Sequence, residues 1–341
     1  MSMQRRIVIA GGSGQVGTFL ARRFHARGDS VIVLSRTPAT RAWGVVSWDG
    51  ATLGAWQKEL DGADVLINLA GRNVNCRHTS ANRREILESR VCSTQILGLA
   101  VERCANPPRV WLNASTATIY RHSFDRAMDE RSGEISLAQP NAPAPWNFSI
   151  EVATRWEKTF FESRTPSTRK VALRSAMVMS PDKGGIFDVL LRLARFGLGG
   201  AAGSGKQYVS WIHEADFLNA VDFLIDHKEF SGPVNLSSPN PTANREFMWA
   251  IRKAWGIPAG LSASAWMLEI GAVFLRTETE LILKSRRVVP GKLLEAGFQF
   301  QFPRWKEAAE ELVGQRRKDS LVMRHKRAEG VGIQNNTTGQ S

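Results

Sequence analysis

The sequence predicts an α/β protein of the Rossmann type, in which a doubly wound parallel sheet is followed by a smaller, mostly C-terminal substrate region. Three observations predict this class. Short apolar runs alternate with amphipathic stretches, and a glycine-rich turn joins the first run to the first stretch. The 341 residues are 43% hydrophobic, which is enough to build a substantial core.

The first 36 residues predict a strand, a turn, a helix and a second strand. Residues 7–10 (IVIA) form an apolar run, and residues 31–34 (VIVL) form the next one. Apolar residues at helical spacing mark the helix between them, at Val16, Phe19, Leu20 and Phe24. Gly28 stands where that helix should end. A β-α-β unit of this length implies a parallel pair of strands.

The same alternation continues along the chain. Further strands are predicted at residues 63–70, 109–113 and 170–174, with a helix at about 81–104. Residues 121–147 are rich in Pro, Asn and Ser and predict a long loop of the kind that lids and binding sites use.

The change in pattern suggests three regions. We place the dinucleotide-binding Rossmann domain at residues 1–180, because the strand and helix alternation is clear there. After it the pattern loosens into helices and short turns, and we assign residues 181–314 to the substrate side. Residues 315–341 carry six basic and two acidic residues and end in Gly, Asn, Thr and Gln, so we expect a disordered basic tail.

The net charge of +13 raises the question of a nucleic-acid partner, because a basic surface attracts polyanions. No recognisable nucleic-acid module accompanies the charge, and its clearest run lies in the expected tail. We therefore expect no specific nucleic-acid partner. The apolar stretches fall well short of the ~20 residues that a bilayer crossing needs, so we expect a soluble protein with no membrane partner and no cleaved signal.

The cysteines indicate the redox compartment. Cys76, Cys92 and Cys104 are odd in number and match neither a CxxC motif nor a metal-ligand spacing. This usage fits a reducing compartment, and we expect a cytoplasmic protein without a metal site.

The turn after the first strand reads GGSGQVG and satisfies a dinucleotide-binding pattern in two registers. Glycines there let the backbone approach a pyrophosphate, whose charge then meets the N–H groups at the start of the helix. The predicted cofactor-binding residues of the turn are Gly11, Gly12, Ser13, Gly14, Gln15, Val16 and Gly17. The alternative is a glycine turn that serves packing alone.

The residue after the second strand indicates which dinucleotide binds. NAD-binding proteins usually place Asp or Glu there for the ribose hydroxyls, whereas this chain has Ser35-Arg36-Thr37. Arg36 can pair with a 2′-phosphate and stack on adenine, which favours NADP over NAD. The alternative is a solvated surface arginine.

With these motifs the chain resembles the extended short-chain dehydrogenase/reductase superfamily. The resemblance also rests on Leu69-Ala70-Gly71 after the third strand and on residues 113–120 (NASTATIY) after a later one. More narrowly, the chain resembles NAD(P)-dependent epimerase-family proteins that carry a conserved C-terminal module of unknown function. The further landmarks are VSWD (46–49), INLAG (67–71), RWE (155–157), GSGKQ (203–207), SWIH (210–213), GPVNL (232–236), PNP (239–241) and VPGKLLEAGF (289–298).

The resemblance implies roles for several residues. It assigns Leu69, Ala70 and Gly71 to the cofactor, and it places the C-terminal module at about residues 255–314. In the superfamily a Ser or Thr after the fifth strand holds the reacting oxygen, and Ser115 or Thr116 occupies the matching place. Either hydroxyl is equally able to satisfy local backbone groups instead.

One expected pair of residues is missing. Typical members carry Tyr-x-x-x-Lys, in which the lysine lowers the pKa of the phenol so that it can exchange a proton. Counting back from residues 155–157 puts Ser149 and Ala153 at these places. The remaining candidates for proton transfer are Glu151, one turn from the expected position, and His213, whose side chain titrates near neutral pH. Both types of residue more often have structural roles.

Two functions stay open on this basis. The first is an NADP-dependent oxidoreductase or epimerase that acts on an unknown small-molecule carbonyl, alcohol or nucleotide-linked substrate. The second is a catalytically silent NADP(H)-binding sensor or scaffold, which the missing Tyr-x-x-x-Lys favours. A homodimer is an open alternative to a monomer.

Overall fold

The computed structural model describes residues 4–37, 39–136, 143, 146–264 and 280–334. The strands are β1 Arg6–Ala10, β2 Ser30–Ser35, β3 Gly44–Ser47, β4 Val65–Asn68, β5 Val110–Thr116, β6 Arg169–Ser175, β7 Met177–Met179, β8 Tyr208–Val209, β9 Trp211–His213, β10 Gly232–Leu236 and β11 Thr242–Ala243. The α-helices are α1 Gln15–Ala26, α2 Ser80–Glu102, α3 Asn147–Glu162, α4 Ile186–Arg195, α5 Glu214–Asp226, α6 Asn244–Trp255, α8 Glu280–Leu283, α9 Gly291–Glu295 and α10 Trp305–Gln334, and short 3₁₀ turns follow at η1 Ala55–Glu59 and η2 Ala117–Ile119.

Seven strands form one parallel sheet in the order β10-β6-β5-β4-β1-β2-β3. From β1 the chain first winds outward through β2 and β3, and it then returns to build β4, β5, β6 and β10 on the other side. The reversal lies between β1 and β4. In open α/β sheets this switch point, at the carboxyl ends of the strands, is where ligands bind.

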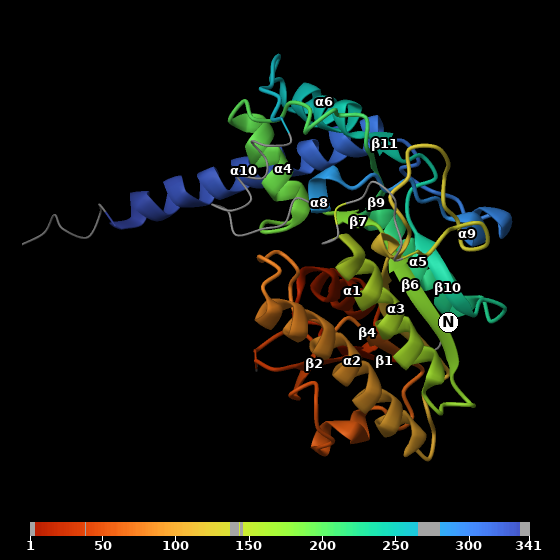
Figure 1. Ribbon diagram of the computed structural model, residues 1–341. Helices are drawn as coiled ribbons and strands as arrows, with labels where there is room; N and C mark the ends of the chain where they lie inside the picture. Colours follow the sequence, from red (N-terminus) through yellow and green to blue (C-terminus); the bar gives the residue numbers. More distant parts are fainter. Residues whose placement is uncertain (1–3, 38, 137–142, 144–145, 265–279, 335–341) are drawn as a thin grey trace, which may run out of the picture.

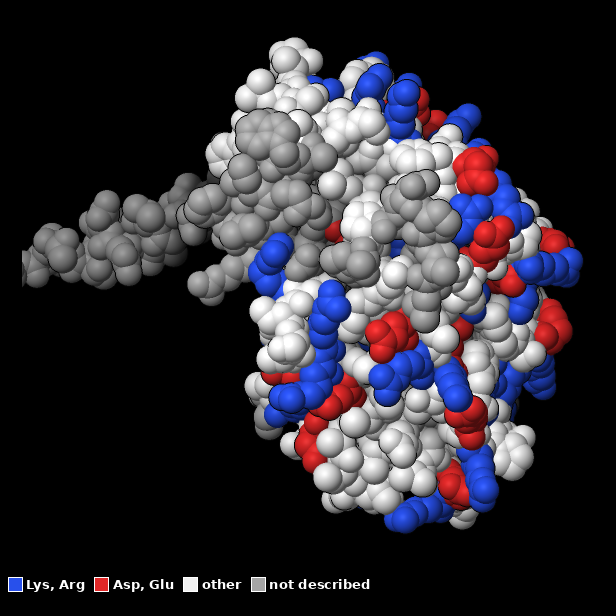
Figure 2. Space-filling model, viewed as in Figure 1, with Lys and Arg blue, Asp and Glu red and all other residues white. Residues whose placement is uncertain are grey.

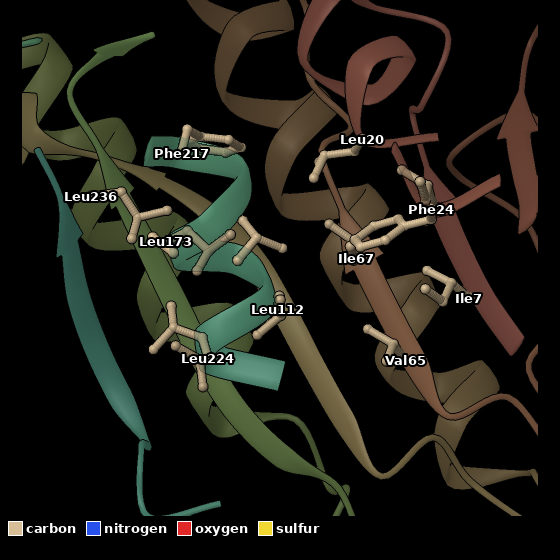
Figure 3. Packing of buried hydrophobic residues seen from close by; sticks show 14 of the residues in the cluster. Ile7, Leu20, Phe24, Val65, Ile67, Leu112, Leu173, Phe217, Leu224 and Leu236 are labelled. Atoms are coloured by element: carbon tan, nitrogen blue, oxygen red, sulfur yellow. The ribbon is translucent and has the colours of Figure 1, made fainter. Parts of the chain in front are cut away.

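Helices cover both faces of the sheet because successive side chains of a strand point to opposite sides. Ile7 and Ile9 of β1 belong to the core under α1 and α5, and Figure 3 shows Ile7 near Phe24 of α1. In the same core, Phe217 and Leu224 of α5 lie over the strands that carry Leu112 and Leu173. Val8 points the other way, into a core shared with α2 and α3. The Rossmann-type fold that the sequence predicts is therefore confirmed.

A second core forms among α4, α6 and α10, which Figure 1 shows grouped at one end of the sheet. Trp305 at the start of α10 stacks on Phe247 of α6 with ring centroids 3.9 Å apart, and it meets Trp211 of β9 edge-on at 4.8 Å. This helical group is the smaller, mostly C-terminal region.

The structure differs from the expected organisation in two respects. Strand β10 and helix α5 complete the Rossmann layers, although both lie beyond residue 180. Helix α10 continues to Gln334, so the expected disordered tail is helical from residue 315 to that point, and residues 335–341 lie outside the described residues. Within the described chain, no helix combines the length and the apolar character that a membrane crossing requires.

Charged residues of both signs are interspersed on the face that Figure 2 shows. On the face shown in Figure 2, basic side chains alternate with acidic ones, and exposed pairs such as Lys158 with Glu162 add local neutralisation.

Candidate functional site

The glycine turn lies at the switch point and is tightly packed. Gly11 adopts a positive φ of 70°, its N–H donates to Leu34 at 2.9 Å, and a Cβ there would lie 2.6 Å from the Ala70 Cα. A Cβ on Gly17 would lie 2.3 Å from the Gly12 Cα. Helix α1 can approach the turn only because these positions lack side chains.

Gly14 and Gln15 stand at the start of α1, where Gly14 is less tightly enclosed than Gly11 and Gly17. Gly14 caps α1 without any side-chain cap, and a Cβ there would meet nothing nearer than the Gly11 carbonyl oxygen at 4.0 Å. The first turn of the helix contains no acidic residue, so its leading N–H groups can meet an anion. The buried amide Nε2 of Gln15 has no hydrogen-bond partner among the described residues. These features fit a dinucleotide whose diphosphate sits on the start of α1, while the exposed Ser13 lies within the same turn.

The loop after β4 closes the other side of the turn. Buried Asn68 uses its side-chain oxygen to accept from the Ala70 N–H at 3.0 Å, and its amide donates to Asn113 at 2.7 Å. The Leu69 N–H donates to the Ala10 carbonyl at 2.8 Å. The structure thus brings Leu69, Ala70 and the exposed Gly71 next to the glycine turn.

Arg36 lies at the carboxyl end of β2 with an exposed side chain. Ser35 shapes the loop, because its hydroxyl oxygen accepts from the Thr37 N–H at 3.2 Å. Among the described residues, no carboxylate forms an ion pair with Arg36. The guanidinium is therefore available at the place where the ribose of a dinucleotide would carry a 2′-phosphate.

A pocket of about 450 Å³ opens beside the glycine turn, between the ends of β5 and β6 and the first turns of α3. Its apolar wall comes from Val16, Leu69, Phe148, Val152, Trp156 and Phe217. Its polar wall includes hydroxyls from β5, η2, α3 and β6. A pocket of this size and lining is typical of small-molecule sites.

Ser115 and Thr116 both line the pocket, and both hydroxyls already have partners. The Ser115 hydroxyl donates to the Glu157 carboxylate at 2.5 Å, within a buried network. The Thr116 hydroxyl oxygen accepts from the Thr118 N–H at 3.1 Å and donates to the Thr118 hydroxyl at 3.0 Å. Thr116 is the more accessible of the two, because Ser115 is 6% exposed and Thr116 is half-buried.

The place of the missing tyrosine is occupied by a hydrogen-bonded triad. Ser149 lines the pocket and donates to the Glu280 carboxylate at 2.6 Å. Lys284 contacts the other oxygen of Glu280 at 3.3 Å and donates to the Thr118 carbonyl at 3.2 Å. The Lys284 side chain is fully buried, and burial lowers its pKa to about 8. Glu280 and Lys284 thus stand behind Ser149, more than 100 positions away from it in the sequence.

Glu151 and His213 lie away from this pocket. Glu151 is on the exposed face of α3 and pairs with Arg155 at 3.6 Å. His213 is the N-cap of α5, where its Nδ1 accepts from the Ala215 N–H at 3.1 Å and its Nε2 contacts Glu311 at 3.0 Å. Burial lowers the pKa of His213. Both residues have protein partners, and neither lines the pocket.

Three residues of this site escaped the sequence analysis: Arg90, Glu280 and Lys284. Arg90 lies in the middle of α2, and an arginine on a helix is usually expected to face solvent. Glu280 and Lys284 have the ordinary spacing of a surface i,i+4 pair. Residue type and spacing alone therefore carried no signal that distinguished them. Among the described residues, there is no group of three or more His, Cys, Asp or Glu that could hold a metal ion.

Comparisons with known proteins agree with this geometry. The NAD dependent epimerase/dehydratase family matches residues 7–236, and a domain of unknown function, DUF1731, matches residues 263–312. Epimerase family protein SDR39U1 of Bos taurus is 32% identical over 314 residues, which cover 90% of this chain and 99% of the relative. Epimerase family protein SERP0438 of Staphylococcus epidermidis is 29% identical over 309 residues, which cover 91% of this chain and 99% of the relative.

Solved structures show the same likeness. The crystal structure of human epimerase family protein SDR39U1 (isoform 2) with NADPH matches with a TM-score of 0.79 and 29% identity, covering 91% of this chain and 99% of that one. UDP-N-acetylglucosamine 4-epimerase from Bacillus cereus matches with a TM-score of 0.70 over 92% of this chain and all of its own. At 18% identity, the second likeness concerns the fold alone. Glu280 and Lys284 both fall within the matched domain of unknown function.

Replacing Ser115 with alanine separates a structural hydroxyl from a substrate-binding one. We expect Ser115→Ala to lower the free energy of unfolding by about 1–3 kcal/mol, because the buried Glu157 carboxylate loses a hydrogen bond. Urea denaturation measures the change. Ser167→Ala, at an exposed serine, is the matched control and should stay within about 0.5 kcal/mol of the parent. Equal stability of the two variants would contradict the structural role.

The depressed pKa of Lys284 predicts a pH dependence of stability. Between pH 8 and the ordinary lysine pKa of 10.5, the folded protein has released this proton while the unfolded chain keeps it. Stability contributed by this site therefore rises with pH through that window. We expect the difference in unfolding free energy between the parent and Lys284→Met to increase by about 1 kcal/mol from pH 7 to pH 9.

Chemical denaturation across this pH range measures the effect. Lys58→Met, at an exposed lysine, provides the control, and its difference from the parent should stay level. A level difference for Lys284→Met as well would show that this ammonium group titrates alike in both states.

Proposed function

As the chain belongs to the NAD dependent epimerase/dehydratase family, we propose that it binds NADP(H) and catalyses an oxidoreductase or epimerase-type reaction on a carbonyl, alcohol or nucleotide-linked substrate. The observation that carries the proposal is the meeting of the glycine turn with a hydroxyl-lined pocket at the switch point of the sheet. The glycine turn and the start of α1 would hold the diphosphate, and the adjoining pocket would receive the nicotinamide.

Arg36 supports NADP in preference to NAD. Its exposed guanidinium stands at the end of β2, where an acidic residue would repel a 2′-phosphate. The human relative named above was crystallised with NADPH, which is in keeping with this choice.

The chain's own groups suggest how a proton would move. NADP⁺, when bound, would accept a hydride from the carbon that carries a substrate hydroxyl, and NADPH would return it in the reverse reaction. Ser149 faces the pocket and donates its proton to Glu280, so its oxygen can accept a proton from a substrate hydroxyl as its own proton passes to the carboxylate. The buried ammonium of Lys284 balances the charge of Glu280. Thr116 lies on the same pocket and can hold the reacting oxygen.

A catalytically silent sensor or scaffold is the second candidate. Ser149 and Ala153 occupy one face of α3 where the resemblance expects tyrosine and lysine, and an aliphatic hydroxyl exchanges protons less readily than an activated phenol. Such a protein would keep the dinucleotide site and transmit its occupancy to a partner.

Hydride transfer distinguishes the two candidates. We expect the purified protein to oxidise NADPH with at least one member of a panel of aldehydes, ketones, oxo acids and UDP-hexoses. Ser149→Ala should then lower kcat by about 100-fold or more, because the proton path is cut. Absorbance at the NADPH band measures the rate. Absence of both NADPH oxidation and isotope exchange across the panel would favour the silent protein.

Arg36→Ala tests the choice of cofactor. We expect it to weaken NADPH binding by about 10- to 100-fold, because a charge-assisted hydrogen bond to the 2′-phosphate is lost. NADH affinity should fall much less, because NADH lacks that phosphate and loses only the stacking contact on adenine. Fluorescence titration gives both dissociation constants, and Arg103→Ala, an exposed arginine beyond the end of α2, is the control. An equal loss for NADPH and NADH would argue against the assignment.

A further inference from the structure

The pocket contains one positive charge that the proposed reaction does not use. Arg90 of α2 lines the wall, with its Nη1 donating to the Ile86 carbonyl at 2.9 Å. Its Cζ lies 5.2 Å from the centroid of the Trp156 ring. On another side it packs on Gly71, where a Cβ would lie only 3.0 Å from the Arg90 Cζ. The guanidinium is therefore held in place by an aromatic ring, a carbonyl and a glycine.

No acidic side chain balances this cation within the part of the chain that the structure describes. Two other arginines are paired, Arg72 with Glu85 and Arg174 with Glu157. Burial lowers the pKa of Arg90 to about 10, which leaves it charged at neutral pH. Holding a charge in a partly apolar wall without a counter-charge costs free energy. An anion that enters the pocket and pairs with Arg90 would offset this cost.

The position of Arg90 shows which anion is suited to it. The start of α1 would hold the cofactor's diphosphate, and α1 covers one face of the sheet, whereas α2 belongs to the layer on the opposite face. The nicotinamide is neutral when reduced and positive when oxidised, so it offers no negative charge to Arg90. The remaining occupant of the pocket is the substrate.

We propose that Arg90 binds a carboxylate or phosphate group of the substrate, so that the substrate is a small anionic hydroxy or oxo compound. This inference rests on the proposed function and assigns its substrate class. The anion would pair with the guanidinium beside Trp156, and the reacting oxygen would lie toward Thr116 and Ser149 on the same pocket. A volume of about 450 Å³, shared with the nicotinamide, restricts the substrate to a small molecule.

Binding measurements test the proposal without knowledge of the natural substrate. The probes are oxalate, malonate, inorganic phosphate and glycerol 3-phosphate, titrated by calorimetry into protein saturated with NADP. We expect saturable binding of at least one probe to the parent, and a loss of about 10- to 100-fold in Arg90→Met. Arg90→Lys should retain part of the affinity, because it keeps the charge and loses the planar fork. Comparison of the carboxylate probes with the phosphate probes shows which of the two anions Arg90 binds.

The same helix offers a matched control. Arg83 lies over the Phe148 ring at 4.9 Å and donates to the His78 carbonyl at 3.1 Å, but it does not line the pocket. Arg83→Met removes the same charge and a comparable ring contact, and it should bind the probes as the parent does.

Three results would overturn the proposal: no saturable binding of any probe up to about 50 mM, equal binding by Arg90→Met and the parent, or a tenfold loss of NADPH affinity in Arg90→Met. The third would assign Arg90 to the cofactor's phosphates. If Arg90→Met fails to fold, Arg90→Lys provides the test. Probe binding by Arg90→Lys equal to that of the parent would show that the guanidinium is not required and would contradict the proposal. Failure of the parent to bind NADPH would instead overturn the proposed function.

Discussion

A buried ion pair holds helix α3 against the sheet, and the pocket depends on the position of that helix. Arg174 of β6 donates two hydrogen bonds to Glu157 of α3, at 2.7 and 2.8 Å, and both side chains are 10% exposed or less. Removing one partner of such a pair leaves a buried charge without compensation, so the two residues act as a unit. With Glu157 fixed, the adjacent face of α3 presents Ser149 and Trp156 to the pocket.

The pair also extends into a chain of directional hydrogen bonds. Arg174 donates to the Tyr120 hydroxyl at 2.9 Å, and that hydroxyl donates to Asn235 of β10 at 3.0 Å. Asn235 in turn donates its side-chain amide to the Val289 carbonyl at 2.9 Å. Hydrogen bonds restrict orientation as well as distance. The segment that carries Lys284 is thereby tied to the sheet, which explains how residues of the C-terminal module reach the pocket wall.

The sequence predicted local structure well and long-range assembly poorly. The glycine turn and the first strands depend on residues close in sequence, and they were found by spacing alone. Strand β10 was missed because Gly232, Pro233 and Asn235 interrupt the apolar run that marks the other strands. Glu280 could not be placed beside Ser149, and the partner of the Ser115 hydroxyl could not be foreseen, because these contacts join segments far apart in the sequence. The residue types suggested which side chains could bind a ligand, but only tertiary packing determines which of them line the pocket.

The contact between Gln15 and Gly185 links the two cores of the protein. Gly185 caps α4, and a Cβ on it would lie 2.2 Å from the Gln15 Nε2, so the start of α4 rests directly on the glycine turn. A ligand that immobilises the turn therefore also restrains the end of a helix that belongs to the second core. By thermodynamic linkage, the free energy of binding is then shared with α4, whose opening fluctuations become rarer. Because Gly185 has no side chain, the core formed by α4, α6 and α10 responds to whether a ligand occupies the glycine turn of the Rossmann layers.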